Sequence, residues 1–256
     1  MHQERKSEWL EGADWELFER QYREPYRINL AFFSWLADCG VLASNRNKQI
    51  LYVGAGMGAN LFHVHSRYPG NIYKGVDLNP ECVRKGNERL QSLNATDCSL
   101  EVEDLYQFPP AYCNSFNGIF SLATLSWLPD FESAANCFVR QNPEWIAATS
   151  LFYDGPVDAT IKISDYTKPI SGSESTEKFY NVYSLPRVKE FFGNRGYTEF
   201  CCQPFEIDID LPKPDHRGMG TYTEQLANGR RLQISGPVLM NWYFILAKKE
   251  KKTKKA

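Results

Sequence analysis

The sequence lacks several patterns that would place it in a common functional class. It contains no Cys-x-x-Cys, no His-Glu-x-x-His and no Gly-x-x-x-x-Gly-Lys-Ser/Thr, so neither a metal site nor nucleoside triphosphate hydrolysis is indicated. No apolar run approaches the roughly 18 residues typical of a transmembrane helix. The formal net charge of -2 leaves no basic excess. We therefore expect neither nucleic acid nor a membrane as a partner.

The cysteines and the first residues bear on the cellular compartment. The 7 cysteines are odd in number and scattered, with Cys201 and Cys202 adjacent, which does not resemble a disulfide framework. Reduced thiols are typical of the cytoplasm. The charged start of the chain, residues 1–6, leads into no apolar segment, so no secretory signal is indicated. These features predict a cytoplasmic protein.

The most informative stretch is a glycine-rich turn that follows a short apolar run. Residues 50–53 are apolar and lead into Gly54-Ala55-Gly56-Met57-Gly58, and a second apolar run ends at Asp77. Glycines allow a backbone to approach a ligand closely, and a carboxylate at the end of the next strand accepts hydrogen bonds from ribose hydroxyls. The pattern therefore indicates a nucleoside cofactor.

Periodicity predicts the elements around this turn. Residues 7–42 are expected to be helical, with a turn at Pro25, because proline interrupts helices. Asn79-Pro80 is typical of a helix start. From residue 49 onward, predicted strands alternate with helices, which indicates a parallel sheet covered on both faces. The predicted strands are 49–53, 72–76, 99–102, 118–122 and 145–153, and the predicted helices between them are 59–68 and 80–93.

The second half has a less regular pattern. Residues 155–175 are rich in Gly, Pro, Ser and Thr and predict a loop, and residues 185–192 predict a short helix. Strands are expected at 197–209 and 238–247. Between them, Asn228-Gly229 separates two alternating segments, which predicts a β-hairpin with positive φ in its turn.

Several of these stretches together resemble class I S-adenosylmethionine-dependent methyltransferases. The glycine turn is similar to their Gly-x-Gly-x-Gly motif, and residues 7–42 correspond to the helical segment that precedes their first strand. Glu103-Asp104-Leu105 resembles the acidic segment after their third strand, and residues 117–130, ending in Leu128-Pro129-Asp130, resemble their fourth-strand block. The resemblance implies an α/β, Rossmann-like three-layer sandwich. Its mostly parallel seven-stranded sheet would have an antiparallel last strand, a helical N-terminal segment and an inserted hairpin before that strand.

The resemblance also implies the cofactor, S-adenosylmethionine, and the residues around it. The glycine turn would approach the methionine end, Asp77 the ribose, Asp104 and Leu105 the adenine, and residues 123–125 the inner edge of the cofactor. The implied cofactor-binding residues are Gly54, Ala55, Gly56, Gly58, Asp77, Leu78, Asp104, Leu105, Ala123, Thr124 and Leu125.

The residues that would bind an acceptor have less support from the sequence. Trp127 follows the fourth strand, Tyr153 and Asp154 end the fifth, and Tyr26 and Arg27 belong to the N-terminal segment. An ordinary packing or surface role remains an alternative for each. Methyl transfer mainly requires alignment of the two reactants, and a general base only when the nucleophile must lose a proton. No catalytic residue is therefore assigned.

Two other functions remain open at this stage. An NAD(P)-dependent oxidoreductase uses a similar glycine turn, and a methyltransferase-like domain can act as a non-catalytic partner protein. The acceptor, expected to be a small or medium-sized molecule, and the oligomeric state are not indicated. The predicted division is a helical segment that covers the cofactor and substrate (1–48), a methyltransferase domain (49–249) and a disordered lysine-rich tail (250–256).

Overall fold

The computed structural model describes residues 15–164, 177–215 and 220–250. Its centre is an eight-stranded sheet in which seven strands follow the order β3-β2-β1-β4-β5-β13-β9 and the short β8 pairs with β5. The first five of these strands are parallel, whereas β13 runs antiparallel to both β5 and β9. The strands are β1 (Gln49–Val53), β2 (Ile72–Asp77), β3 (Cys98–Val102), β4 (Gly118–Leu122), β5 (Trp145–Tyr153), β8 (Tyr183–Ser184), β9 (Glu199–Pro204) and β13 (Trp242–Lys248).

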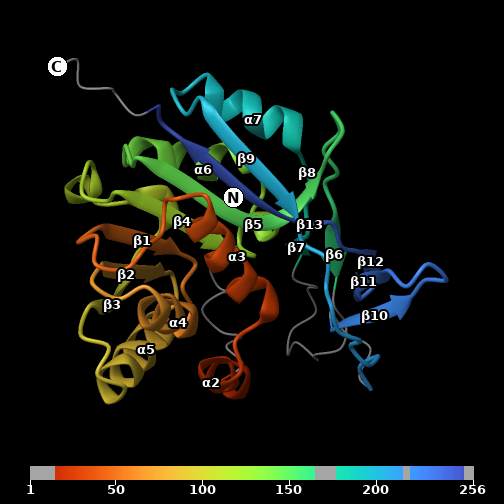
Figure 1. Ribbon diagram of the computed structural model, residues 1–256, viewed down its shortest axis with the longest axis horizontal. Coiled ribbons are helices and arrows are strands. Elements are labelled where there is room, and N and C mark those ends of the chain that lie inside the picture. Colours follow the sequence, from red (N-terminus) through yellow and green to blue (C-terminus); the bar gives the residue numbers. More distant parts are fainter. Residues whose placement is uncertain (1–14, 165–176, 216–219, 251–256) are drawn as a thin grey trace.

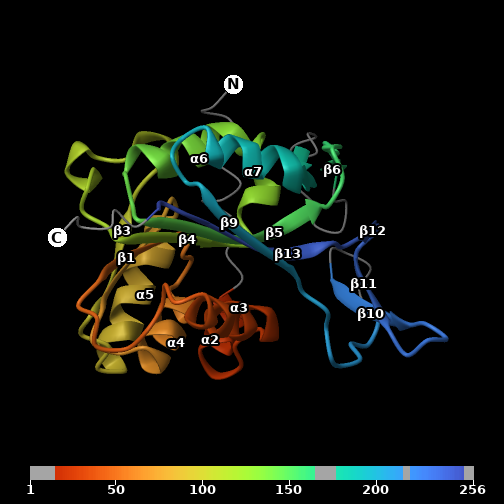
Figure 2. The same ribbon diagram turned by 45° about the horizontal axis from the view of Figure 1, so that its top comes forward.

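Helices cover both faces of the sheet, as Figure 2 shows in side view. The helices α3 (Arg27–Asp38), α4 (Ala59–Arg67) and α5 (Pro80–Ser92) lie on one face, and α6 (Phe131–Arg140) and α7 (Leu185–Gly193) on the other. Each face has its own apolar core because side chains alternate along a strand: Ile50 and Tyr52 of β1 pack towards α3 and α4, and Leu51 and Val53 towards α6. The predicted three-layer fold is confirmed.

Local sequence accounts for the two helices that follow β1 and β2. Helix α4 begins after Gly58, which has a φ of 81°, a left-handed conformation that glycine adopts without strain. Helix α5 begins with Pro80 after Asn79, whose side chain accepts from the amides of Glu81 and Cys82. This cap satisfies two of the amides that have no partner within a helix. The turn and the end of β2 are thus fixed close together.

The N-terminal segment folds as two helices rather than one. Helix α2 (Trp15–Arg23) ends before Pro25, and α3 starts at Arg27. Proline disfavours a helical conformation in the residue before it, so the expected turn at Pro25 is confirmed. Residues 7–14 of the expected helix, 165–175 of the expected loop and 251–256 of the expected tail lie outside the described residues.

The second half differs from the sequence prediction in several places. The hairpin consists of β10 (Thr221–Gln225) and β11 (Arg231–Ser235), which form a separate small sheet with β12 (Val238–Leu239). Within its turn, Gly229 has a φ of 79°, as expected. The predicted strand 238–247 was wrong as a single element, because the chain leaves the small sheet at Leu239 and joins the main sheet only at Trp242.

Four further elements were missed or given wrong ends. Residues 162–164 (β6, Lys162–Ser164) form a two-stranded sheet with β7 (Glu177–Phe179) within a stretch expected to be a loop. Strand β9 ends at Pro204, five residues before the predicted end; proline lacks an amide hydrogen and is tolerated on edge strands. Helix α6 was not predicted, although Asp130 caps it by accepting from Ser133 N at 2.7 Å.

Candidate cofactor and acceptor site

All the residues implied for the cofactor come from one edge of the sheet. They follow the carboxyl ends of β1, β2, β3 and β4, which are neighbours in the order β3-β2-β1-β4. Figure 1 shows these strand ends side by side, with α4 and α5 packed beneath them. Ligands of open α/β sheets bind outside the carboxyl ends of the strands. The edge is therefore the expected place for a nucleoside cofactor.

The glycine turn is held by hydrogen bonds within the protein. The amides of Gly54 and Ala55 both donate to Val76 O at 3.0 Å, and Gly58 N donates to Ala55 O at 2.9 Å. Gly56 N donates to the Asp77 carboxylate at 2.7 Å. These four donors are already used, so these amides are not available to a ligand.

Asp77 joins the turn to the end of β2. One carboxylate oxygen accepts from Gly56 N and the other from Asn79 N at 3.0 Å. Burial raises the pKa of Asp77, and hydrogen bonds from the amides of Asn79, Gly56 and Leu78 oppose this rise. A carboxylate has about four acceptor positions, and the three amides take three of them, so one remains for a further donor. The geometry therefore fits an acceptor for ribose hydroxyls.

The ends of β1 and β4 are in close contact. A β-carbon at Gly54 would lie 2.4 Å from Thr124 Oγ1, and Gly54 has a φ of +76°. Ala123 has a φ of 53°, which is uncommon for a residue other than glycine. Its amide donates to Thr149 O at 2.9 Å and lies 3.1 Å from Thr149 Oγ1. Strained backbone of this kind is often found at functional sites.

Asp104 lies after β3 and organises its own loop. Its carboxylate accepts from Tyr106 N at 3.0 Å and from Gln107 Nε2 at 3.1 Å, and so caps the short 3-10 helix Leu105–Gln107. Leu105 packs against the core on the α6 side of the sheet. Asp104 and Leu105 are only half-buried, so both retain surface that a ligand can contact.

The residues predicted to bind the acceptor are not gathered into one cluster. Trp127, in the 3-10 helix Leu125–Trp127, packs against Tyr180 with ring centroids 4.7 Å apart. Tyr153 ends β5 and is 42% exposed, and Asp154 next to it is also exposed. Tyr26 is exposed, and the Arg27 guanidinium donates to Asp208 at 2.9 Å. Arg27 therefore links the start of α3 to the chain that leads into the small sheet.

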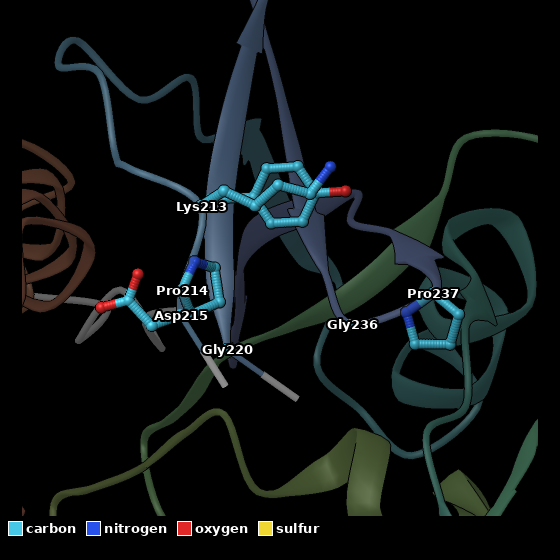
Figure 3. Close-up of a pocket in the computed structure, with 7 residues that line it drawn as sticks. Lys213, Pro214, Asp215, Gly220, Gly236 and Pro237 are labelled. Carbon is cyan, nitrogen blue, oxygen red and sulfur yellow. The ribbon is translucent and has the colours of Figure 1, made fainter. Parts of the chain in front are cut away.

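Two cavities lie outside this strand edge. The first, of about 700 Å³, lies beside the small sheet, and Figure 3 shows Lys213 and Pro214 on one side of it and Gly236 and Pro237 on the other. The second, of about 370 Å³, lies at the start of α6 and α7 and includes Asp158 and Arg187. Neither is lined by a residue of the predicted cofactor or acceptor set.

Two residues that matter at the site were not included in the predicted cofactor and acceptor set. Phe18 of α2 contacts the glycine turn, and its place with Trp15 and Tyr22 on one helical face was the available signal. Asn181 donates to Leu128 O at 2.9 Å and holds the loop that carries Trp127. No local pattern marks Asn181. Among the described residues, no group of three or more His, Cys, Asp or Glu side chains could hold a metal, and no helix could span a membrane.

Comparison with known proteins defines the class of this fold. Residues 50–141 match the family model described as a methyltransferase domain. This match supports the resemblance to class I S-adenosylmethionine-dependent methyltransferases, and the sheet order confirms their Rossmann-like fold. No curated protein matches the sequence.

Solved structures give the same fold. The YcgJ protein of Bacillus subtilis is 13% identical, with a TM-score of 0.55, and the match covers 86% of this chain and 99% of that one. The phosphoethanolamine N-methyltransferase 2 of Haemonchus contortus, solved with S-adenosylhomocysteine, is 14% identical, with a TM-score of 0.54 and coverage of 88% and 53%. A protein of Galdieria sulphuraria is 17% identical, with a TM-score of 0.50 and coverage of 70% and 62%. The chain thus spans less than two thirds of the last two proteins.

Proposed function

We propose that the protein transfers a methyl group from S-adenosylmethionine to a small or medium-sized acceptor. The observation that carries this proposal is the Asp77 carboxylate, held between Gly56 N and Asn79 N at the carboxyl end of β2. It lies beside a glycine turn in a protein whose residues 50–141 match a methyltransferase domain. A fixed acceptor next to a glycine-rich backbone turn suits the ribose and methionine end of this cofactor.

The proposed roles of the other residues follow the strand edge. The turn from Gly54 to Gly58 would contact the methionine end, and Asp77 and Leu78 the ribose. Asp104 and Leu105 would contact the adenine, and residues 123–125 the inner edge of the cofactor. This assignment is supported by the positions of these residues at the ends of four neighbouring strands.

The main role of these residues in methyl transfer would be to align the cofactor and the acceptor. When bound, the cofactor supplies an electrophilic methyl group, and the protein orients a nucleophile along the bond that breaks. Orientation of this kind contributes roughly 7–11 kcal/mol to lowering a reaction barrier. The rigid loops after β1 and β4, each tied to a neighbouring strand, supply fixed walls for that purpose. Residues 1–48 are assigned to a segment that covers the cofactor and acceptor, and residues 49–249 to the methyltransferase domain.

The acceptor is proposed to be a small molecule bound near Trp127, Tyr153 and Asp154, with Tyr26 and Arg27 as further candidate contacts. Phosphomonomethylethanolamine, which is held in the solved complex of the Haemonchus contortus enzyme, is an example of a small molecule bound by this fold.

We also propose a reducing, cytoplasmic location. All 7 cysteines are free, which supports this proposal.

The state of the turn amides favours this cofactor over a dinucleotide. A dinucleotide fold binds pyrophosphate through backbone amides at the turn and the helix start. Here the amides of Gly54, Ala55, Gly56 and Gly58 already donate to protein oxygens. S-adenosylmethionine has no phosphate groups, so its binding does not require hydrogen bonds from these amides.

Calorimetry tests the proposal directly. We expect S-adenosylhomocysteine to bind and NADH not to bind; the reverse result would reject the proposal. Asp77→Ala should weaken S-adenosylhomocysteine binding about 10- to 100-fold, because hydrogen bonds to a charged acceptor are lost. Asp97→Ala is the matched control, since Asp97 is a half-exposed carboxylate near His65. Equal affinity in the Asp77 variant and the parent would contradict the ribose assignment.

An activity assay distinguishes an enzyme from a non-catalytic partner protein. We expect the protein to transfer label from labelled cofactor to at least one candidate acceptor, whereas a non-catalytic partner protein would transfer none.

A further inference from the structure

The peptide between Met57 and Gly58 lies at the centre of the glycine turn. Gly56 and Gly58, on either side of Met57, have φ values of 53° and 81°. Glycine adopts many backbone conformations at little cost, so these two residues do not by themselves fix the direction of the peptide. A single shape of the turn therefore depends on hydrogen bonds to the polar groups of this peptide.

Both polar groups of the peptide have partners, one within the turn and one outside it. Gly58 N donates to Ala55 O at 2.9 Å, and Met57 O accepts from the Tyr22 hydroxyl of α2. Because a peptide unit is planar, a bond that holds the carbonyl also fixes the direction of the amide. Tyr22 thus supplies a restraint on the turn from a distant part of the chain.

The hydrogen bond from Tyr22 is buried between two helices. Tyr22 is 5% exposed, and its ring packs against Phe62 of α4 at a centroid distance of 5.9 Å. On α5, a β-carbon built at Gly86 would lie 2.6 Å from Met57 O, so the carbonyl lies close to the helix backbone. Burial raises the pKa of Tyr22, so its hydroxyl stays protonated and remains a donor at neutral pH.

Other contacts fix α2 against the turn. His63 of α4 makes a hydrogen bond with Gln21 O at 2.8 Å, and Arg89 Nε of α5 lies 3.6 Å from the Glu19 carboxylate. The Phe18 ring contacts Gly56 directly, since a β-carbon there would lie 2.9 Å from Phe18 Cε1. Helix α2 and the glycine turn are therefore packed as one unit.

We propose that Tyr22 is a positioning residue of the cofactor site, which holds the peptide between Met57 and Gly58 in the orientation that the cofactor requires. This inference rests on the proposed function, in which the turn contacts the methionine end of the cofactor. Tyr22 acts through Met57 O rather than on the cofactor itself. Without its hydroxyl, the turn would adopt other orientations for part of the time. The measured affinity would then fall in proportion to the fraction of molecules that remains competent to bind.

Calorimetry with S-adenosylhomocysteine on the full-length protein tests this inference. Tyr22→Phe keeps the buried ring and removes only the hydroxyl, so the variant should fold. It should weaken binding about 3- to 10-fold, as expected when one hydrogen bond that sets a conformation is lost. Hydrogen exchange measured by NMR gives a second readout, because the Gly58 amide should exchange faster in Tyr22→Phe than in the parent.

Tyr197→Phe is the matched control. Tyr197 is 1% exposed, and its hydroxyl also donates to a backbone carbonyl, Pro143 O, at 3.0 Å. Pro143 precedes the amino end of β5, away from the glycine turn. Both variants should lower the midpoint of thermal unfolding. Tyr197→Phe should nevertheless bind within about twofold of the parent, as expected for a distant site, and should leave exchange of the Gly58 amide unchanged.

Each outcome of these measurements decides the question. If the parent binds and Tyr22→Phe binds as tightly, the inference is wrong while the proposed function stands. Equal losses of affinity in the two tyrosine variants would reveal a general effect of lower stability and would also reject the inference. If the parent does not bind S-adenosylhomocysteine, the proposed function fails and this inference fails with it.

Discussion

Replacing Asn181 with alanine should test how the loop after β4 is held. Asn181 is 1% exposed, and its amide group connects two separate segments. Its Nδ2 donates to Leu128 O at 2.9 Å, and its Oδ1 accepts from Ile161 N at 3.0 Å. The backbone amide of Asn181 also donates to Ser126 O at 2.8 Å, and this bond persists in any non-proline variant. The substitution therefore removes only the side-chain contacts.

The expected loss can be estimated from these contacts. Alanine leaves the Ile161 amide without its partner, whereas Leu128 O keeps the Tyr183 hydroxyl as a donor at 3.3 Å. One buried group left unpaired costs about 1–3 kcal/mol, so the free energy of unfolding should fall by about 1–3 kcal/mol. In a chain of this size each kcal/mol lowers the midpoint of thermal unfolding by about 2–4 °C, so the midpoint should fall by roughly 2–12 °C.

Urea denaturation followed by tryptophan fluorescence measures this change. Asn228→Ala is the matched control, because Asn228 is exposed and accepts from Arg230 N at 3.1 Å in the hairpin turn; a surface change of this kind stays within about 0.5 kcal/mol. Asn181→Asp should also destabilise the protein, since a carboxylate cannot donate to Leu128 O. An Asn181→Ala protein within about 0.5 kcal/mol of the parent would refute the argument that this amide holds the loop.

Two further predictions concern the cofactor site. Gly54→Ala should lower the free energy of unfolding by about 2–4 kcal/mol, since it adds a left-handed alanine and a contact at 2.4 Å with Thr124 Oγ1. Gly40→Ala, at a φ of +75° with nothing within 4 Å, should cost only about 1–2 kcal/mol, and equal losses in urea denaturation would remove the contact argument. Burial raises the pKa of Asp77, so the folded protein holds this proton more tightly than the unfolded chain. The resulting stability is present below the ordinary carboxyl pKa and is lost as pH rises through the raised value. Affinity for S-adenosylhomocysteine should change in the opposite sense and weaken as pH falls through that value, because the ionised form accepts the ribose bonds. Calorimetry from about pH 8 to about pH 4 should show this loss in the parent but not in Asp77→Asn, and identical profiles would contradict it.

Much of the candidate cofactor site at the carboxyl ends of β1, β2, β3 and β4 could be predicted, because the sequence patterns that determine it are local. Gly58 marks the start of α4 and Asn79-Pro80 the start of α5, and each lies within a few residues of the structure that it determines. Asp77 ends a short apolar strand, so its place beside the turn follows from the parallel pairing of β1 and β2. The same local reasoning failed at residues 238–247, because apolar alternation does not reveal that the chain changes from one sheet to another.

The sequence by itself determined the class of fold, the glycine turn and the carboxylate beside it. Only the tertiary structure decided which distant groups meet them: Phe18 on Gly56, Tyr22 on Met57 O and Arg27 on Asp208. Periodicity shows that a helix has an apolar face, but many partners can cover such a face equally well. The choice among them depends on the simultaneous packing of α2, α4 and α5 against the strand edge. For that reason the glycine turn could be recognised from neighbouring residues, whereas the ring that covers it became evident only in the folded chain.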